Sequence, residues 1–131
     1  MNRYGQKGQA IVELAFSIVL LLLLVFGSIE FGRVMYIRNT LNLAAREGAR
    51  IASVTPMPVD TGSSGSVANY VRGCIPFDQT GLNITVTPET FTSGCTITVD
   101  VSLPFQTVVP MIIPQLNNIN LTAQASMRYE Y

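Results

Sequence analysis

One uninterrupted apolar stretch constrains this chain more than any other feature of its sequence. Residues Leu14–Ile29 (LAFSIVLLLLLVFGSI) contain no charged side chain, and Glu13 and Glu30 bracket them. As an α-helix these 16 residues span about 24 Å, and adding Ala10–Val12 and Phe31–Gly32 makes the helix long enough to cross a membrane. A chain of 131 residues has too little other apolar material to enclose such a cylinder in a soluble core. The stretch therefore predicts a transmembrane helix.

A cleaved secretory signal is the alternative for this stretch, because the basic residues Arg3 and Lys7 precede it. A signal peptidase needs small residues soon after the apolar core, whereas the bulky Phe31, Met35 and Tyr36 follow here. The helical pattern also continues past the stretch. Apolar or small residues recur three or four positions apart as one stripe: Val34, Ile37, Leu41, Ala44, Gly48 and Ile51. We expect one helix over about 9–53, a membrane-spanning part followed by an amphipathic extension, ending before Pro56.

The amphipathic part carries two rows of small residues at four-residue spacing. One row is Ala44, Gly48 and Ala52, and the other is Ala45, Ala49 and Ser53. Small side chains at this spacing let another element approach the helix backbone closely. These residues are candidates for helix packing, and two alternatives remain for what covers them, the chain's own C-terminal domain or a partner helix.

Arg46 and Arg50 lie one turn apart on the same helix and are candidate partner contacts. They are suited to acidic groups of another protein or to lipid head groups. The alternative is a solvated helix face, on which Glu47 pairs with Arg50 three residues later.

Beyond the helix, the sequence changes from a linker to strands. Residues 55–66 (TPMPVDTGSSGS) are rich in Pro, Gly, Ser and Thr, which is typical of a linker. Apolar residues then alternate with polar ones in three places, which predicts three half-buried strands. The apolar members are Leu82, Ile84 and Val86; then Cys95, Ile97, Val99, Val101 and Leu103; then Leu121, Ala123, Ala125, Met127 and Tyr129.

The segment Pro104–Pro114 between the second and third strands is apolar but contains three prolines. Prolines at this density exclude both a second membrane helix and a regular strand. We expect a packed crossover loop, the alternative being a segment that touches the membrane or a partner. The sheet needs a cover for its apolar face, and the small-residue side of the helix supplies one. The fold class expected is α+β, a long helix packed on a small antiparallel sheet of about three strands.

Cys74 and Cys95 are the only cysteines of the chain. If their side of the membrane is oxidising, a disulfide between them is expected. It would close a loop of about twenty residues and stabilise the fold by about 3 kcal/mol. Two unpaired thiols are the alternative.

Composition excludes most catalytic chemistry. The chain has no histidine, which removes Ser-His-Asp and Cys-His catalysis and histidine-containing zinc sites. No phosphate-binding glycine loop and no calcium loop is present. Eight basic and eight acidic residues give no net charge to attract nucleic acid. We therefore expect neither an enzyme nor a nucleic-acid-binding protein, and no metal or cofactor.

A short basic leader ends at Gly8, Glu13 follows four residues after Gln9, and the apolar helix begins at once. This N-terminal pattern resembles the processing site of type IV pilins and pseudopilins. In that superfamily a membrane-bound prepilin peptidase cuts after the glycine. By this resemblance the mature chain begins at Gln9, and Glu13 pairs with the new amine of a neighbouring subunit during assembly. The alternative is that Glu13 only marks the membrane boundary.

Four longer motifs are GQAIVELAF, IEFGRVMY, NLAAREGARIAS and the terminal SMRYEY. Together they narrow the resemblance to the TadE-like family, minor pseudopilins of the tight-adherence (Tad, or Flp) pilus machinery. The resemblance implies a pilin-like fold, insertion in the bacterial inner membrane, an extracytoplasmic C-terminal domain, and as partners the prepilin peptidase, other pilins and the Tad secretion machinery, with homo- or hetero-oligomers formed through helix packing. Charge counting alone opposes this orientation, because the helix after the apolar stretch carries Arg33, Arg38, Arg46 and Arg50, whereas only Arg3, Lys7 and the terminal amine precede the stretch.

The expected organisation is a leader (1–8), a transmembrane helix (9–32), its amphipathic extension (33–54), a linker (55–66) and an extracytoplasmic α+β domain (67–131). The function expected is that of a minor pseudopilin in Tad pilus assembly. An uncleaved single-pass membrane protein with an outer binding or adhesion module is the alternative.

Overall fold

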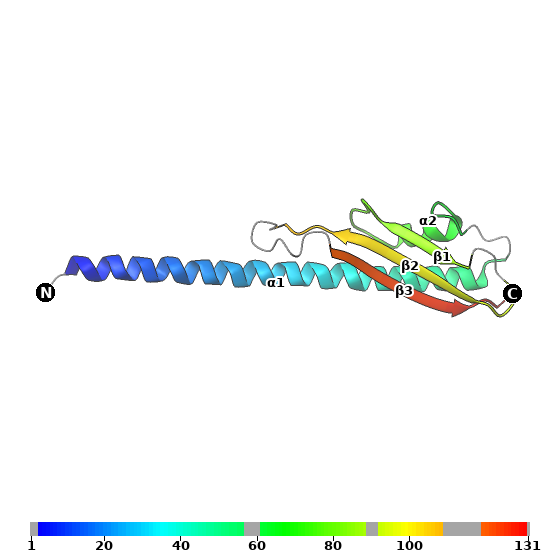
Figure 1. Ribbon diagram of the computed structural model, residues 1–131, viewed down its shortest axis with the longest axis horizontal. Coiled ribbons are helices and arrows are strands. Elements are labelled where there is room, and N and C mark those ends of the chain that lie inside the picture. The colour runs from blue at the N-terminus through cyan, green and yellow to red at the C-terminus, as the bar shows by residue number, and fades with distance from the viewer. Residues whose placement is uncertain (1–2, 57–60, 89–91, 109–118, 131) are drawn as a thin grey trace. The chain divides into compact units, whose positions relative to one another are not determined.

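The computed structural model describes residues 3–56, 61–88, 92–108 and 119–130. Its elements are two helices followed by three strands (Figure 1): α1 (Arg3–Val54), α2 (Ser66–Gly73), β1 (Asn83–Thr87), β2 (Thr96–Phe105) and β3 (Ile119–Arg128). The long helix packs on an antiparallel sheet, so the α+β prediction is confirmed. The chain divides into two compact units, Met1–Arg33 and Val34–Tyr131, and α1 contributes to both.

The long helix forms because no proline interrupts the chain before Pro56. It ends at Val54, because the next residue, Thr55, precedes Pro56 and a residue before a proline is biased away from helical geometry. Two side chains of the last turn satisfy backbone carbonyls there. The Ser53 hydroxyl donates to the Arg50 carbonyl (2.8 Å), and the Thr55 hydroxyl donates to the Ile51 carbonyl (2.6 Å).

The three strands lie in the order β1-β2-β3, and both neighbouring pairs are antiparallel. Their register places Ile84 opposite Val101, and Val101 opposite Ala123. Burial alternates along β1 and β2, with apolar residues inward and polar residues outward. The period-2 pattern of the sequence therefore predicted these strands to within about two residues at each end.

The expectation for Pro104–Pro114 is wrong at its first two residues, because β2 continues through Pro104 to Phe105. Pairing with β1 stops at Ser102, so Pro104 has a strand neighbour only on the β3 side, where it lies opposite Asn120. A proline without a donor N–H is tolerated at such an edge position. Residues 109–118 of this segment lie outside the described part of the chain.

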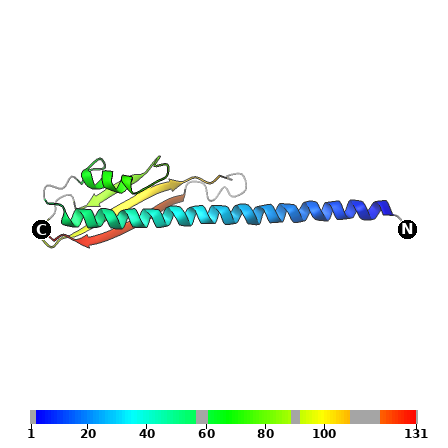
Figure 2. The same cartoon turned by 180° about the vertical axis from the view of Figure 1, so that it is seen from behind.

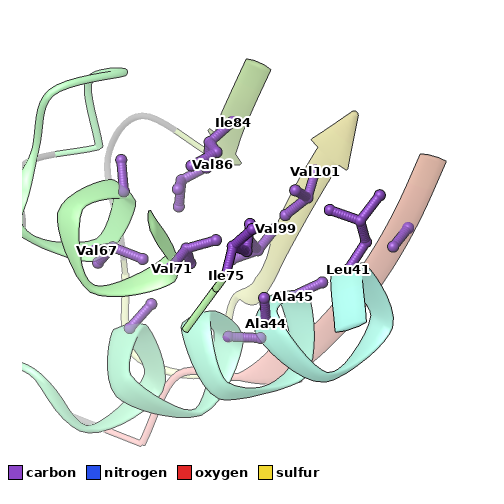
Figure 3. Close-up of a cluster of buried hydrophobic side chains, with 14 of the residues drawn as sticks. Leu41, Ala44, Ala45, Val67, Val71, Ile75, Ile84, Val86, Val99 and Val101 are labelled. Carbon is purple, nitrogen blue, oxygen red and sulfur yellow. The ribbon is translucent and has the colours of Figure 1, made fainter. Parts of the chain in front are cut away.

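The core of the second unit lies between the inner face of the sheet and two helices. The part of α1 after Val34 and the whole of α2 lie on the same side of the sheet (Figure 2). Side chains from α1, α2, β1 and β2 converge there (Figure 3). The fully buried residues with the largest side chains are Phe105, Leu41, Ile84, Ile97, Val67, Val71, Val99 and Val101.

Candidate functional site

The predicted processing site lies on an exposed part of α1. Gly8, Gln9 and Glu13 are all exposed, and a Cβ added at Gly8 would meet nothing within 4 Å. The helix begins at Arg3 rather than near Gln9, so the Gly8–Gln9 peptide bond is helical. The sequence pattern missed this early start because the polar leader has no apolar periodicity, although it contains no proline that would prevent a helix.

The first unit presents an apolar surface that the described part of the chain leaves exposed. Its large apolar side chains from Ile11 to Phe31 are 42–70% exposed. This helix is long and apolar enough to cross a membrane, and none of its most apolar window is buried. A soluble protein rarely exposes so large a contiguous apolar surface, whereas hydrocarbon would cover it at no cost.

An ion pair lies near the end of the apolar stretch. Glu30 is buried, and its carboxylate accepts a hydrogen bond from the Arg33 guanidinium at 3.0 Å. The sequence showed Glu30 only as the residue that ends the uncharged run. The i,i+3 spacing to Arg33 could have indicated the pair, which lowers the cost of removing the carboxylate from water.

The small residues of α1 lie in the chain's own core. Ala44, Ala45, Ala49 and Ala52 are each no more than 1% exposed, and Gly48 is buried among them. A Cβ at Gly48 would overlap Val71 Cγ2 of α2 and lie 3.4 Å from Val99 Cγ1 of β2. The sequence left two possible covers for these small residues, the chain's own domain or a partner helix. In the described part of the chain, its own domain covers them, which leaves no access for a partner helix.

Arg46 and Arg50 both lie on the exposed side of α1, but their surroundings differ. Arg50 donates two hydrogen bonds to Glu47, at 2.9 Å and 2.8 Å, which is the pair considered under the solvated-face alternative. Hydrogen bonding to Glu47 and the negative charge of that carboxylate raise the pKa of Arg50 above its ordinary value. Arg46 instead lines a shallow hollow with Asn39, Asn42 and Leu43. The two arginines are therefore not equivalent as contacts for a partner.

Cys74 and Cys95 are half-buried and pack against the edge of the core cluster. Both carry free thiols in this structure. The disulfide stays a prediction that depends on the redox state of the compartment.

The described residues contain no group of three or more His, Cys, Asp or Glu side chains that could hold a metal ion. Function must therefore be argued from two features, the exposed apolar surface of the first unit and the packed α+β domain of the second.

Residues 8–50 match the family model described as TadE-like protein. The N-terminal segment is TadE-like. This confirms the resemblance read from the motifs of the sequence. No curated protein and no solved structure matches the chain.

The TadE-like segment begins at Gly8 and contains most of the candidate residues. It includes Glu13, the Glu30–Arg33 pair, and both Arg46 and Arg50. It stops before Ala52, and it does not extend to the sheet or to the two cysteines. The family match therefore covers most of α1 and none of the sheet, so the role of the sheet domain must be argued from its geometry.

One contact beyond the TadE-like segment was not foreseen from the sequence. The Tyr129 hydroxyl donates to the Thr55 carbonyl at 3.2 Å, and the Glu130 N–H donates to the Ser53 carbonyl at 3.3 Å. Tyr129 is buried and also pairs through its N–H with the Cys95 carbonyl at 2.8 Å. The end of the chain thus satisfies carbonyls at the end of α1 and ties them to the start of β2. Such a contact spans 74 residues of sequence, so no local pattern could predict it.

Proposed function

We propose that this chain is a minor pseudopilin that takes part in assembling a Tad pilus. The first part of α1 inserts in the bacterial inner membrane, and the α+β domain lies on the extracytoplasmic side. The protein has a structural role and no catalytic activity. Its partners are a prepilin peptidase, other pilins and the Tad secretion machinery.

One observation carries this proposal more than the others. The TadE-like match begins at Gly8, and Gly8 and Glu13 lie at the start of a helix whose apolar residues are exposed along its whole first unit. A carboxylate in this position costs about 2.5–3.5 kcal/mol if it is drawn to the centre of a bilayer. A positive partner at the membrane boundary removes that cost, and cleavage after Gly8 would create one as the free amine of a neighbouring subunit.

The processing step is tested by intact mass and N-terminal sequencing of the membrane-extracted chain, expressed with and without a cognate prepilin peptidase. We expect a new N-terminus at Gln9 that appears only with the peptidase. The variant Gly8→Val should remain uncleaved. It should still insert, because a side chain at Gly8 meets nothing within 4 Å.

Gly5→Val is the matched control, since it places the same side chain in the same leader, three residues before the proposed cleavage site. It should be processed like the wild type. A retained Met1 in the wild-type chain, with the peptidase active on a control pilin, would refute processing.

The assembly role of Glu13 is tested by counting pili on cells that express Glu13→Ala. Piliation should fall while membrane insertion and processing continue. Glu47→Ala is the control, because Glu47 is a glutamate of the same helix that lies outside the apolar stretch and pairs with Arg50. Normal piliation with both Glu13→Ala and Gly8→Val would contradict the pseudopilin mechanism.

A second function is favoured by a specific observation, the helical Gly8–Gln9 bond. A peptidase needs an accessible backbone and would have to unwind this turn first. In the second proposal the chain is uncleaved and remains a single-pass anchor for an outer binding or adhesion module. The same mass measurement separates the two proposals.

A further inference from the structure

The exposed side of α1 in the second unit carries a cation that the fold does not use. Arg46 is exposed and forms no ion pair among the described residues, whereas Arg50 is held by Glu47. The hollow beside Arg46 is lined by two amide side chains, Asn39 and Asn42. This surface therefore offers a positive charge beside neutral hydrogen-bonding groups. Arg38 is also exposed on the same helix, but it does not line this hollow.

The outer face of the sheet is complementary in character. Its central row runs Thr85, Asp100 and Gln124 across the three strands. The rows on either side consist of hydroxyl and amide side chains: Asn83, Ser102 and Thr122 in one row, and Thr87, Thr98 and Ser126 in the other. Asp100 is the one carboxylate among the outward-facing residues of the described strands. Arg128 lies on the same face at the end of β3, four residues after Gln124. This surface therefore offers one negative charge among hydroxyl and amide side chains, with one positive charge at its edge.

The two charges lie at the same level of the second unit, on opposite sides of it. A Cβ at Gly48 would lie 3.4 Å from Val99, which aligns these two positions of α1 and β2. Arg46 lies two residues before Gly48, about 3 Å along the helix, and Asp100 lies one residue after Val99, about 3.3 Å along the strand.

These two steps go in the same direction. The strand β2 begins beside the end of α1, since Tyr129 bonds both to Cys95, just before β2, and to Thr55, just after α1. The strand therefore runs back along the helix, as the direction of the β2 arrow shows (Figure 1). Moving from Gly48 to Arg46 and from Val99 to Asp100 thus shifts both charges toward the start of α1.

We infer that a second copy of this chain docks side by side with the first, so that Arg46 of one copy pairs with Asp100 of the other. The outward side of α1 in one copy then covers the outer sheet face of the next, with amides over hydroxyls around the ion pair. Because Arg46 and Asp100 lie at the same level along α1, one copy needs no displacement along that helix to pair with the next. The helices of the two copies can then stay parallel, as they must in copies inserted the same way in one membrane. The two surfaces differ and lie on opposite sides of the unit, so the contact is head-to-tail and can extend into a row or a ring of copies.

This inference goes beyond the proposed function, because it needs neither cleavage after Gly8 nor a pilus. It is tested with the purified full-length chain in lipid nanodiscs or detergent micelles. Two fluorescently labelled batches are mixed and diluted, and energy transfer between them gives the dissociation constant of self-association.

The charge-reversal variants Arg46→Asp and Asp100→Arg should each weaken self-association about tenfold or more, because each places like charges opposite one another. The double variant R46D/D100R should restore the wild-type affinity to within about threefold, since the pair is re-formed with its signs exchanged. Circular dichroism checks that each variant folds. The neutral pair Arg46→Gln and Asp100→Asn provides the same test with a smaller loss if a reversal disturbs the fold.

The matched control is R38D/D100R. Arg38 is an exposed arginine of the same helix, so this double variant has the same composition of charges as R46D/D100R but should not recover. Self-association that is unchanged in the two single variants would overturn the inference. A wild-type chain that stays monomeric at every concentration, or recovery in R38D/D100R as large as in R46D/D100R, would also overturn it.

Discussion

The two halves of α1 share one helical backbone but differ in the size and the burial of their apolar side chains. Before Arg33 the helix carries bulky apolar side chains on all sides, and none of its most apolar window is buried. After Val34 the inward side chains are mostly alanine or glycine, and several of them are completely buried. Among the described residues, none packs over the most apolar part of the first half. The small side chains of the second half let a sheet and a second helix approach its backbone. The difference shows that in this chain side-chain size distinguishes a surface left for the surroundings from one used by the fold.

The sharpest way to break this comparison is to truncate one leucine in each half. Leu41→Ala should destabilise the α+β domain by about 2–5 kcal/mol, because Leu41 is completely buried and its removal leaves a cavity. Leu24→Ala, at a leucine 66% exposed on the same helix, should leave the stability of that domain unchanged. Urea unfolding of the detergent-solubilised chain, followed by tyrosine fluorescence, measures both effects. Equal losses in the two variants would contradict the division of the helix into two environments.

Glycines give a second matched pair, with a somewhat smaller effect. Gly48→Val should destabilise the domain by about 2–3 kcal/mol, since the added side chain overlaps Val71 and presses on Val99. Gly27→Val adds the same atoms where nothing lies within 4 Å, and the domain should unfold at the same urea concentration as in the wild type. If Gly48→Val is as stable as the wild type, the close packing of α1 against α2 and β2 is wrong.

Removing one hydroxyl tests the link between the end of the chain and the second half of α1. Tyr129→Phe keeps the buried ring but loses the hydrogen bond to the Thr55 carbonyl, which should cost about 0.5–1.5 kcal/mol. The same unfolding measurement applies. Tyr36→Phe, at a tyrosine 56% exposed, is the control and should have no measurable effect.

The smallest effect is expected on the exposed side of the second half. Glu47→Gln removes the ion pair with Arg50, whose side chains are both about half-exposed, so the unfolding midpoint should fall only slightly. The difference from the wild type should disappear in concentrated salt, because salt screens exposed charges. A large loss that persists in salt would show that the pair is not a surface interaction.

Period and side-chain size allowed much of this structure to be predicted. The stripe from Val34 to Ile51 predicted the helix, and the alternations around Ile84, Val99 and Ala123 predicted the three strands with their buried faces. The small residues around Gly48 predicted close packing, although the sequence left open whether the cover was the chain's own domain. The packed structure resolves that choice because it shows which side chains lie opposite the small ones.

What the sequence did not reveal depends on pairing between distant positions. Pro104 continues β2 because β1 stops pairing before it, which only the register shows. The bond from Tyr129 to the end of α1 and the common level of Arg46 and Asp100 depend on the direction of β2 relative to the helix. The early start of α1 at Arg3 was missed for another reason, since its polar residues carry no periodic signal.

The central claim is that one helix faces lipid in its first half and belongs to a folded domain in its second. Two leucines of similar exposure test it most directly, Leu20 at 54% and Leu43 at 63%. Each is replaced by a spin-labelled cysteine in a chain that carries Cys74→Ser and Cys95→Ser, and the chain is placed in bilayers at a low protein-to-lipid ratio. The label at Leu20 should be relaxed by oxygen dissolved in the lipid and shielded from a water-soluble nickel complex, and the label at Leu43 should show the reverse. Ready access of the nickel complex to Leu20, or shielding of Leu43 equal to that of Leu20, would contradict the account.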